Sequence, residues 1–182
     1  DYLKGKKEIH LVGEDTDLTV GIDGRTFVNC EGDRNMPDGE IFTGPEETKI
    51  NGHVSFSFPA VYQGREVQGV RVWFENGVAV RWSAEKNEEF LTRMLTTDEG
   101  ANKLGEFAFG TNFGIQRFIK NILFDEKIGG TIHMAFGGGY PETGSLNRSA
   151  IHWDMICDLR RGSEVTVDGE LFAKDGEYLL WK

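Results

Sequence analysis

Hydrophobic and polar residues alternate along much of the chain with a period of two, the pattern of half-buried β-strands. The clearest case lies between residues 70 and 82, where Val, Val and Phe occupy every second position up to residue 74, and Val, Val and Trp do so from residue 78. Asn76 and Gly77 separate the two runs and can supply the positive φ angles of a type I′ turn. This pattern predicts a β-hairpin with its turn at Asn76.

Shorter runs of the same kind fill the first third of the chain and its C-terminal tail. EIHLVG, LTVGI and TFVNC are separated by turn-forming residues, and EVTVDGELFAKDGEYLLW predicts successive hairpins with turns at its two Asp-Gly pairs. Residues 31–47 contain Pro37 and Pro45, which break a helix, and are too polar for a core strand. We therefore predict a long irregular loop there, a kind of segment that often carries function.

The period of 3.6 residues that marks an amphipathic helix occurs in two places. In residues 84–101 the apolar side chains at positions 90, 91, 94 and 95 share one face, and Asn87 is a candidate N-cap before an acidic first turn. Residues 115–124, IQRFIKNILF, predict a second short amphipathic helix. The expected fold class is α+β: a mainly antiparallel β-sheet with a few short helices, in a single compact domain over residues 1–182.

The composition is that of an ordinary soluble globular protein. Hydrophobic residues make up 38% of the chain and charged residues 27%. The formal net charge is −10 and no basic run occurs, which argues against a nucleic-acid partner. No apolar run approaches the roughly 20 residues of a membrane helix, so we expect no membrane partner and a cytoplasmic location. Cys30 and Cys157 fit no disulfide or CxxC pattern and are expected to be reduced, buried thiols.

Two histidines lie in apolar, strand-like runs. In AIHWDMI, His152 and Asp154 are two residues apart, so they would project from the same face of a strand. A carboxylate in such a strand is costly unless it is paired or bound to a metal. Taken alone, this pattern is explained most simply by a hydrogen bond between the two side chains in the core. His133, in TIHMAFG, is likewise explained by a satisfied core histidine.

Three glutamates occur where the chain is apolar or turns apolar. Glu106 lies between Gly and Phe, Glu40 precedes Ile-Phe, and Glu126 follows an apolar run together with Asp125, where a helix end would also explain the acids. Unpaired glutamates are almost never fully buried. Imidazole and carboxylate groups are ligands of zinc, cobalt or manganese, and six of them suit two adjacent ions better than one. No HExxH motif is present, which excludes the helical single-zinc site.

Five motifs in a fixed order, NMPDGEIFTGP, GEFAFGTN, LFDEK, HMAFGGGYPETG and SAIHWDMICDL, together resemble the catalytic half of the aminopeptidase T and aminopeptidase S family. The resemblance implies a metal-dependent aminopeptidase that removes N-terminal residues from peptide substrates. It also implies a water shared by two divalent ions, which would be Zn, Co or Mn. Family members carry a further N-terminal domain, so we expect this chain to correspond to the C-terminal catalytic domain. A homodimer would then form with or through the N-terminal domain.

The resemblance implies metal ligation for six residues: Glu40, Glu106, Glu126, His133, His152 and Asp154. Glu106 matches the residue that bridges both ions, and KIGGT, which follows Glu126, looks like a short insertion relative to the commoner form of the family. Tyr140 matches an active-site tyrosine whose phenol could donate to the substrate oxyanion. The alternative is an aromatic ring packed over a hairpin turn. Glu46 and Glu47 are candidate general bases, or else exposed loop acids.

Two other functions stay open. The chain could be a non-catalytic metal-binding or assembly module, inactive without the N-terminal domain. It could also be a different two-metal hydrolase that acts on an amide or a phosphoester, although we expect no Arg or Lys beside the ligands to clamp a phosphate. For the aminopeptidase, we expect His133 and His152 to face each other from neighbouring strands, with GGGYPETGSLN lining the mouth of the site.

Overall fold

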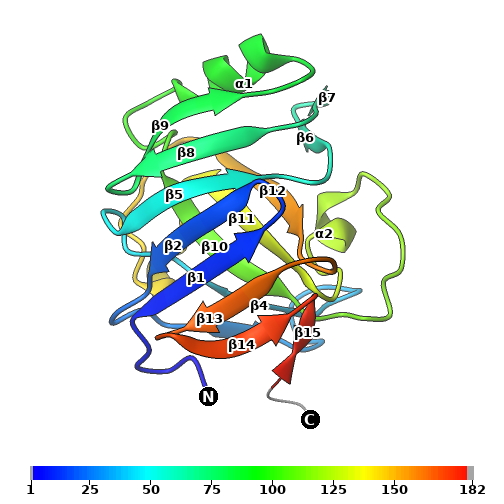
Figure 1. Cartoon of the computed structure of the whole chain (residues 1–182). Coiled ribbons are helices and arrows are strands. Elements are labelled where there is room, and N and C mark those ends of the chain that lie inside the picture. Colours follow the sequence, from blue (N-terminus) through cyan, green and yellow to red (C-terminus); the bar gives the residue numbers. More distant parts are fainter. Residues whose placement is uncertain (1, 180–182) are drawn as a thin grey trace.

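Two antiparallel β-sheets make up most of the structure, a computed structural model that describes residues 2–179. Figure 1 shows the larger sheet as a curved layer of strands in front of the smaller one. The eight-stranded sheet has the order β15 (Glu177–Tyr178), β14 (Glu170–Lys174), β13 (Glu164–Val167), β1 (Glu8–Gly13), β2 (Thr16–Gly21), β5 (Ile50–Ser55), β8 (Arg71–Glu75) and β9 (Val78–Ser83). The predicted fold class, a mainly antiparallel α+β domain, is confirmed.

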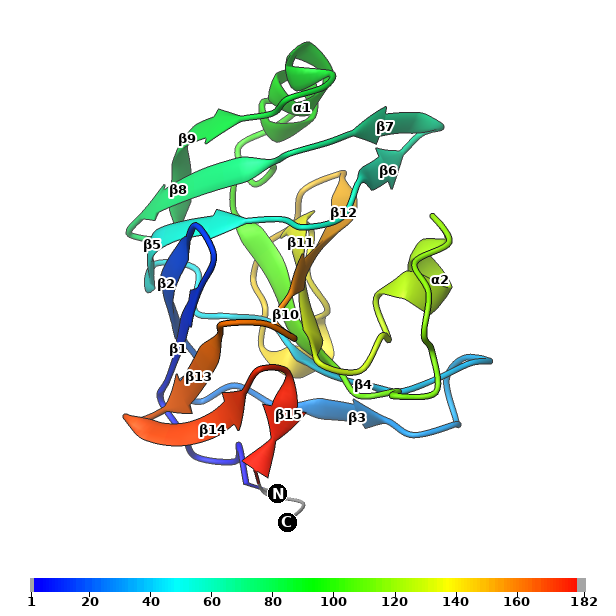
Figure 2. The ribbon, with the colours of Figure 1, turned by 45° about the vertical axis from the view of Figure 1, so that its right-hand side comes forward.

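The five-stranded sheet carries the strands that matter for function. Its order is β12 (His152–Asp158), β11 (Thr131–Gly137), β10 (Leu104–Gly110), β4 (Glu40–Thr43) and β3 (Val28–Cys30). The remaining elements are short: the hairpin β6 (Ala60–Tyr62) and β7 (Arg65–Val67), the helices α1 (Glu88–Leu95) and α2 (Ile122–Asp125), and the 3-10 turn η1 (Pro141–Thr143). Figure 2 shows α2 beside β11 and β12, away from the strands of the larger sheet.

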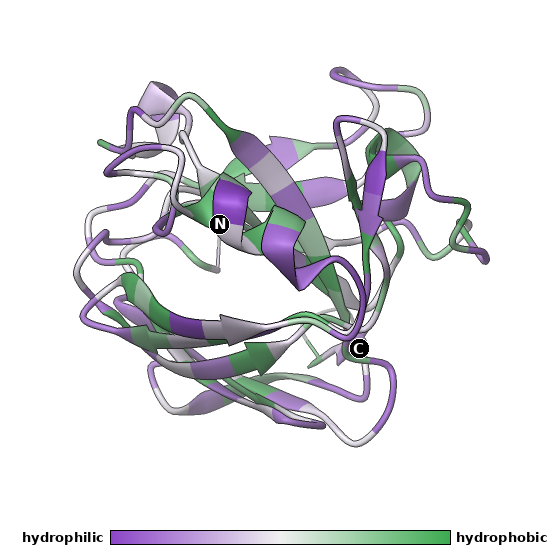
Figure 3. Ribbon diagram, turned by 90° about the horizontal axis from the view of Figure 1, so that it is seen from above, coloured by the Kyte–Doolittle hydropathy of each residue, from purple (hydrophilic) through white to green (hydrophobic). Residues whose placement is uncertain are grey.

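The hydrophobic core lies between the two sheets. The ring of Phe136, on β11, lies with its centroid 5.8 Å from that of Phe74 on β8 and 6.4 Å from that of Phe56. Seen from above in Figure 3, hydrophobic and hydrophilic residues alternate in bands along the strands. Because side chains alternate between the faces of a strand, one face of β10, β11 and β12 packs into this core. The opposite face is free for other chemistry.

The predicted hairpin around Asn76 is confirmed, with one irregularity. Asn76 and Gly77 have φ angles of 49° and 83°, as a type I′ turn requires. The register shifts within the hairpin, so that Phe74 pairs with Ala79, and Trp73 pairs with Arg81. The bulge leaves Val80 unpaired and 49% exposed, while Ala79 takes the buried position. The sequence alternation predicts the strands but not this extra residue.

The two predicted helices have different outcomes. The first is confirmed as α1, which buries the apolar residues Phe90, Leu91, Met94 and Leu95. Asn87 occupies the N-cap position, but its side-chain amide donates to the carbonyl of Glu66 and makes no capping bond.

The second helix, over residues 115–124, is wrong in its extent, because only α2 is helical there. The Asp125 carboxylate accepts bonds from the backbone N–H groups of Ile119 and Asn121, and Lys120 has a φ of 62°. These groups hold an irregular loop instead.

The predicted loop over residues 31–47 is also only partly correct. It contains β4, in which Phe42 and Thr43 are buried. The prediction failed because the backbone N–H groups of the polar turn before the strand have a partner in Asp38. Its carboxylate accepts hydrogen bonds from the N–H groups of Gly32, Arg34 and Asn35. The strand can therefore begin directly after a very polar segment.

Other predictions concern the cysteines and the membrane. Cys30 and Cys157 are free and buried, as predicted. Between residues 2 and 179 no helix reaches the length and apolarity that crossing a membrane would need.

Candidate metal centre

Six ionisable side chains meet on the face of the five-stranded sheet that points away from the core. Five of them belong to β4, β10, β11 and β12, and the alternation of side chains along each strand puts them on this same face. The sixth comes from the residue that caps α2. These are the six residues singled out in the sequence: Glu40, Glu106, Glu126, His133, His152 and Asp154.

On at least one neighbouring strand, each strand-borne member of this cluster lies opposite a residue with almost no side chain. Cross-strand partners are Glu40 and Gly110, His133 and Ala108, Glu106 and Ala135, Asp154 and Ala135, and His152 and Gly137. A larger side chain at these positions would fill the space between the ligands. At Gly110 an added Cβ would lie only 2.2 Å from the carbonyl oxygen of Ile128. The small residues therefore place little side-chain bulk opposite the ligands.

The polar atoms of the cluster lie at the separations expected of ligands around a common ion. His133 Nε2 lies 3.2 Å from Glu40 Oε2 and 3.4 Å from Glu106 Oε1. His152 Nε2 lies 3.4 Å from Glu106 Oε2 and 3.4 Å from Asp154 Oδ2. Ligands about 2.1 Å from a tetrahedral ion lie about 3.4 Å from one another. Glu106 thus presents one oxygen to each histidine.

These residues form three overlapping groups, in each of which the candidate ligand atoms lie within 4.8 Å of one another. Two groups share Glu106: one adds Glu40 and His133, and the other adds His152 and Asp154. The third combines Glu126, His133 and Asp154. His133 and His152 do lie on neighbouring strands, but they are not directly opposite, since His133 pairs with Ile156. Glu106 fills the interval between them.

The hydrogen bonding of the cluster fits a cation. Among the described residues, neither ring nitrogen of His133 nor Oδ1 of Asp154 has a hydrogen-bond partner, although all three atoms are buried. Leaving such atoms unpaired is costly. His152 instead uses Nδ1 to contact the carbonyl oxygen of Gly138 at 2.8 Å. That contact fixes the tautomer that directs the Nε2 lone pair at the cluster, as in many metal sites.

Burial and charge shift the pKa values within the cluster. Burial raises the pKa of Glu126 to about 7 and raises the pKa of Glu106 above its ordinary value. Burial works against a charged His133, but the carboxylates of Glu106 and Glu40 raise its pKa well above its ordinary value. The carboxylates therefore demand a cationic partner, which can be a proton or a metal ion.

One residue of the cluster was not predicted. Lys127 has a fully buried side chain, and its Nζ contacts the carboxylate of Glu126 and lies 3.4 Å from Oε1 of Glu40. The expectation that no Lys or Arg lies beside the ligands is therefore wrong. The available signal was the position of this lysine directly after Glu126 in LFDEK. The alternating small residues Ala108 and Ala135 were a second signal that sequence reasoning left unused.

Tyr140 lies at the edge of the cluster, in the glycine loop, residues 137–147. Its ring centroid lies 5.4 Å from that of His152 and 5.4 Å from that of Phe42, and the residue is 41% exposed. Burial, and next the charge of Glu106, raise the pKa of its phenol. The hydroxyl therefore remains a proton donor at neutral pH.

Glu46 and Glu47 lie outside the cluster and have structural partners. Glu47 pairs with Arg25 and accepts a bond from the backbone N–H of Leu146, at 2.6 Å. Arg25 also donates to the carbonyl of Gly144. Glu46 pairs with Lys49 at 3.0 Å. Glu47 and Arg25 thus brace the glycine loop from behind.

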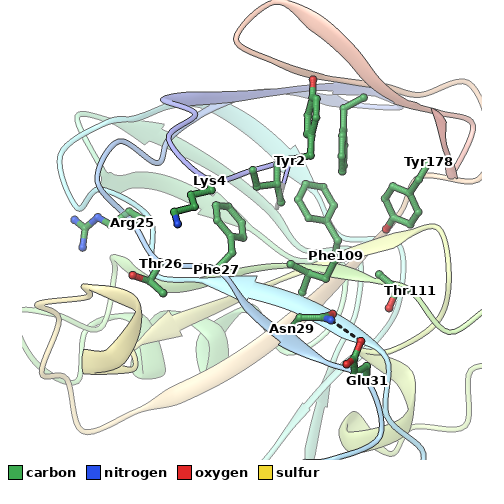
Figure 4. A pocket seen from close by; sticks show the side chains of 13 residues that line it. Tyr2, Lys4, Arg25, Thr26, Phe27, Asn29, Glu31, Phe109, Thr111 and Tyr178 are labelled. Atoms are coloured by element: carbon green, nitrogen blue, oxygen red, sulfur yellow. Dashed lines mark hydrogen bonds between the residues drawn. The ribbon is translucent and has the colours of Figure 1, made fainter. Parts of the chain in front are cut away.

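Two hollows lie near the centre. One of about 280 Å³ reaches Asp154 and is lined mainly by apolar side chains, including Ala60, Val61, Phe118, Ile122 and Ile156. The other, of about 720 Å³, is shown in Figure 4 and contains none of the six candidate ligands. It is lined by Ile41, the neighbour of Glu40 on β4, and so opens on the other face of the sheet. Only the smaller hollow is continuous with the cluster.

Comparisons with known proteins identify the family of this chain. Residues 1–178 match the family described as thermophilic metalloprotease (M29). Aminopeptidase T of Thermus thermophilus is 37% identical over 197 residues, which cover 92% of this chain and 47% of that protein. Aminopeptidase T of Thermus aquaticus is 35% identical over 190 residues, covering 90% of this chain and 45% of that protein.

The structure of wild-type AmpT from Thermus thermophilus has a TM-score of 0.88 and 32% identity, and the match covers 98% of this chain and 51% of that one. This chain spans about half the length of the curated relatives that it matches. The chain belongs to the M29 family of thermophilic metalloproteases.

Proposed function

We propose that this chain is the metal-binding catalytic part of an aminopeptidase, which removes N-terminal residues from peptides. The observation that carries the proposal is the position of Glu106, whose two carboxylate oxygens lie 3.4 Å from His133 and 3.4 Å from His152 respectively. A site for a single ion would not need a carboxylate with one oxygen directed at each of two histidines. The relatives named aminopeptidase T support the choice of peptide substrates.

The proposed ligand sets follow the two groups that share Glu106. Glu40, Glu106 and His133 would hold one divalent ion, and Glu106, His152 and Asp154 would hold the other, with Glu126 within reach of His133 and Asp154. When bound, such a pair of ions acidifies a water and polarises the scissile carbonyl. Histidine and carboxylate ligands accept Zn, Co or Mn.

The side chains around the cluster would orient the peptide. The carboxylates attract the positively charged N-terminus of a substrate. The phenol of Tyr140, which stays protonated, would donate a hydrogen bond to the carbonyl oxygen as negative charge develops on it. The hollow beside Asp154 would receive an apolar side chain next to the scissile bond, because its lining is mainly apolar.

The structure bears on both rival functions. For a phosphoester hydrolase, Lys127 could not serve as a side-chain clamp on the phosphate, because it is buried and already held by two carboxylates. An assembly module that binds no metal would have no need to bury atoms of His133 and Asp154 that lack hydrogen-bond partners, because such atoms are costly to desolvate. A binding module could still use the same ions without cleaving peptides, so activity has to be measured.

The test is an assay of the metal-exchanged protein on leucyl-p-nitroanilide and on bis-p-nitrophenyl phosphate, with His152→Ala as the site variant. We expect Zn²⁺- or Co²⁺-dependent release of p-nitroaniline that is lost in the variant, with no phosphoester cleavage. Metal binding without any cleavage would favour the non-catalytic module. Cleavage of only the phosphate ester would contradict the peptidase proposal.

A further inference from the structure

Lys127 places a positive charge inside the candidate metal centre. Its side chain has no solvent exposure, and a buried ammonium is costly unless it is paired. The partners that the structure provides are the carboxylates of Glu126 and Glu40. Both are candidate metal ligands. The charge of Lys127 is therefore directed at the centre.

The two oxygens of Glu40 face different partners. Oε1 lies 3.4 Å from Nζ of Lys127, whereas Oε2 lies 3.2 Å from Nε2 of His133. Lys127 thus occupies the side of this carboxylate that points away from the histidine. The oxygen that faces His133 remains available to an ion. Glu126 is engaged in the same way, since the lysine contacts its Oε1.

Asn112 fixes the position of Lys127 relative to Glu40. Its backbone N–H donates to the carbonyl of Lys127 at 2.9 Å. Its side-chain amide donates to the carbonyl of Asp38, two residues before Glu40, at 2.7 Å. A Cβ added to Gly39 would lie 2.7 Å from Cβ of Asn112, so the two segments are in close contact. Asn112 therefore joins the backbone segments that carry the ammonium and the carboxylate.

We propose that Lys127 is a positioning residue of the metal centre, whose ammonium holds the Oε1 atoms of Glu40 and Glu126 and leaves one oxygen of each to bind an ion. This inference rests on the proposed metal site. Without the lysine, the two carboxylates would repel each other and could rotate to bind through both oxygens. Hydrogen-bond partners of metal ligands typically contribute 10–100-fold to metal affinity.

A competing role would have the opposite effect. If the ammonium took the place of one ion, it would have to leave when that ion binds, and its removal would tighten binding. Its contact with Oε1 of Glu40, on the side away from His133, favours positioning over competition.

The test is calorimetric titration of the metal-stripped protein with Co²⁺ alone, comparing the wild type with Lys127→Met. The matched control is Lys174→Met, which removes a lysine paired with Glu164 at 2.8 Å on the surface. We expect one of the ions to bind about 10–100-fold more weakly to Lys127→Met than to the wild type. The control variant should bind both ions as the wild type does. The visible Co²⁺ spectrum should weaken in the same variant, because carboxylates that bind through both oxygens raise the coordination number.

Thermal melting shows whether each variant folds. If Lys127→Met does not, Lys127→Gln keeps an N–H donor one bond closer to the backbone and should show a smaller loss of affinity with a smaller spectral change. Unchanged or tighter Co²⁺ binding in either folded variant would overturn the positioning role. Failure of the wild type to bind Co²⁺ would instead overturn the metal site on which this inference rests.

Discussion

Nε2 of His152 lies 3.4 Å from Oε2 of Glu106, whereas His133 faces the other oxygen of that carboxylate, Oε1. This relationship makes Glu106 common to both proposed ligand sets. We expect Glu106→Gln to weaken binding of both ions by at least the roughly 10–100-fold that loss of a ligand's hydrogen-bond partner costs, because the substitution removes a shared anionic ligand. Metal content after dialysis measures this directly. Glu164→Gln, at the surface, is the control, and retention of either ion by Glu106→Gln would argue against the shared role.

Ala135 lies opposite both Glu106 and Asp154 in the sheet. Ala135→Val adds two methyl groups to a fully buried position between these carboxylates. We expect the variant to fold, at a cost of about 1–3 kcal/mol from overpacking, and to lose metal affinity because the ligands are pushed apart. Chemical denaturation and metal titration separate the two effects. A variant that binds metal like the wild type would show that the small residue is not needed for the site.

The rings of Tyr140 and His152 lie in an edge-to-face arrangement. If its phenol stabilises the oxyanion, Tyr140→Phe should lower kcat by about 10²–10³-fold and leave metal content unchanged. Steady-state kinetics on leucyl-p-nitroanilide and elemental analysis provide both readouts. If the ring only packs over the loop, kcat will be close to that of the wild type.

Asp98 links the segment after α1 to the residues that precede β12. Its carboxylate accepts bonds from the backbone N–H of Ala150 at 2.8 Å and the hydroxyl of Ser149 at 2.9 Å. The bond from Ala150, followed by that from Ser149, lowers the pKa of Asp98 below its ordinary value of 3.8. A depressed pKa means that this stabilisation is present above pH 3.8 and is lost as the pH falls through the lower, folded-state pKa.

Asp98→Asn should therefore destabilise the protein by about 1 kcal/mol at pH 7, which lowers Tm by about 2–4 °C. The difference from the wild type should close as the pH falls below 3.8. Melting curves across this range, with the exposed neighbour Glu99→Gln as control, measure it. A difference that persists at the lowest pH would mean that the charge of Asp98 is not responsible.

The sequence was sufficient to predict the parts of the fold that depend on local periodicity. The hairpin at Asn76 and the helix around Phe90 follow from spacing and turn chemistry alone. The helix predicted over residues 115–124 does not form over that range, because backbone N–H groups of this segment donate to the Asp125 carboxylate instead. Local periodicity does not reveal these hydrogen bonds. Strand β4 was missed because the polar turn before it is satisfied by Asp38, which no periodicity reveals.

In the candidate site, too, local spacing predicts some features, whereas others depend on the tertiary structure. His152 and Asp154 could be placed on one face because they are two residues apart on one strand. Their meeting with Glu40 and Glu126 depends on strand order, which the residues alone did not give. The resemblance to a family supplied that grouping, and the structure brings all six side chains together. Lys127 was missed because its carboxylate partner Glu40 lies far away in the sequence, and Asn112 bonds to both segments only in the folded chain.

The most direct test of the two-ion site is anomalous diffraction from crystals of the zinc-loaded protein. We predict two peaks, about 3.5–4 Å apart, with the carboxylate of Glu106 between them and His133 and His152 on opposite sides. A single peak, or peaks that do not contact Glu106, would contradict the two-ion site.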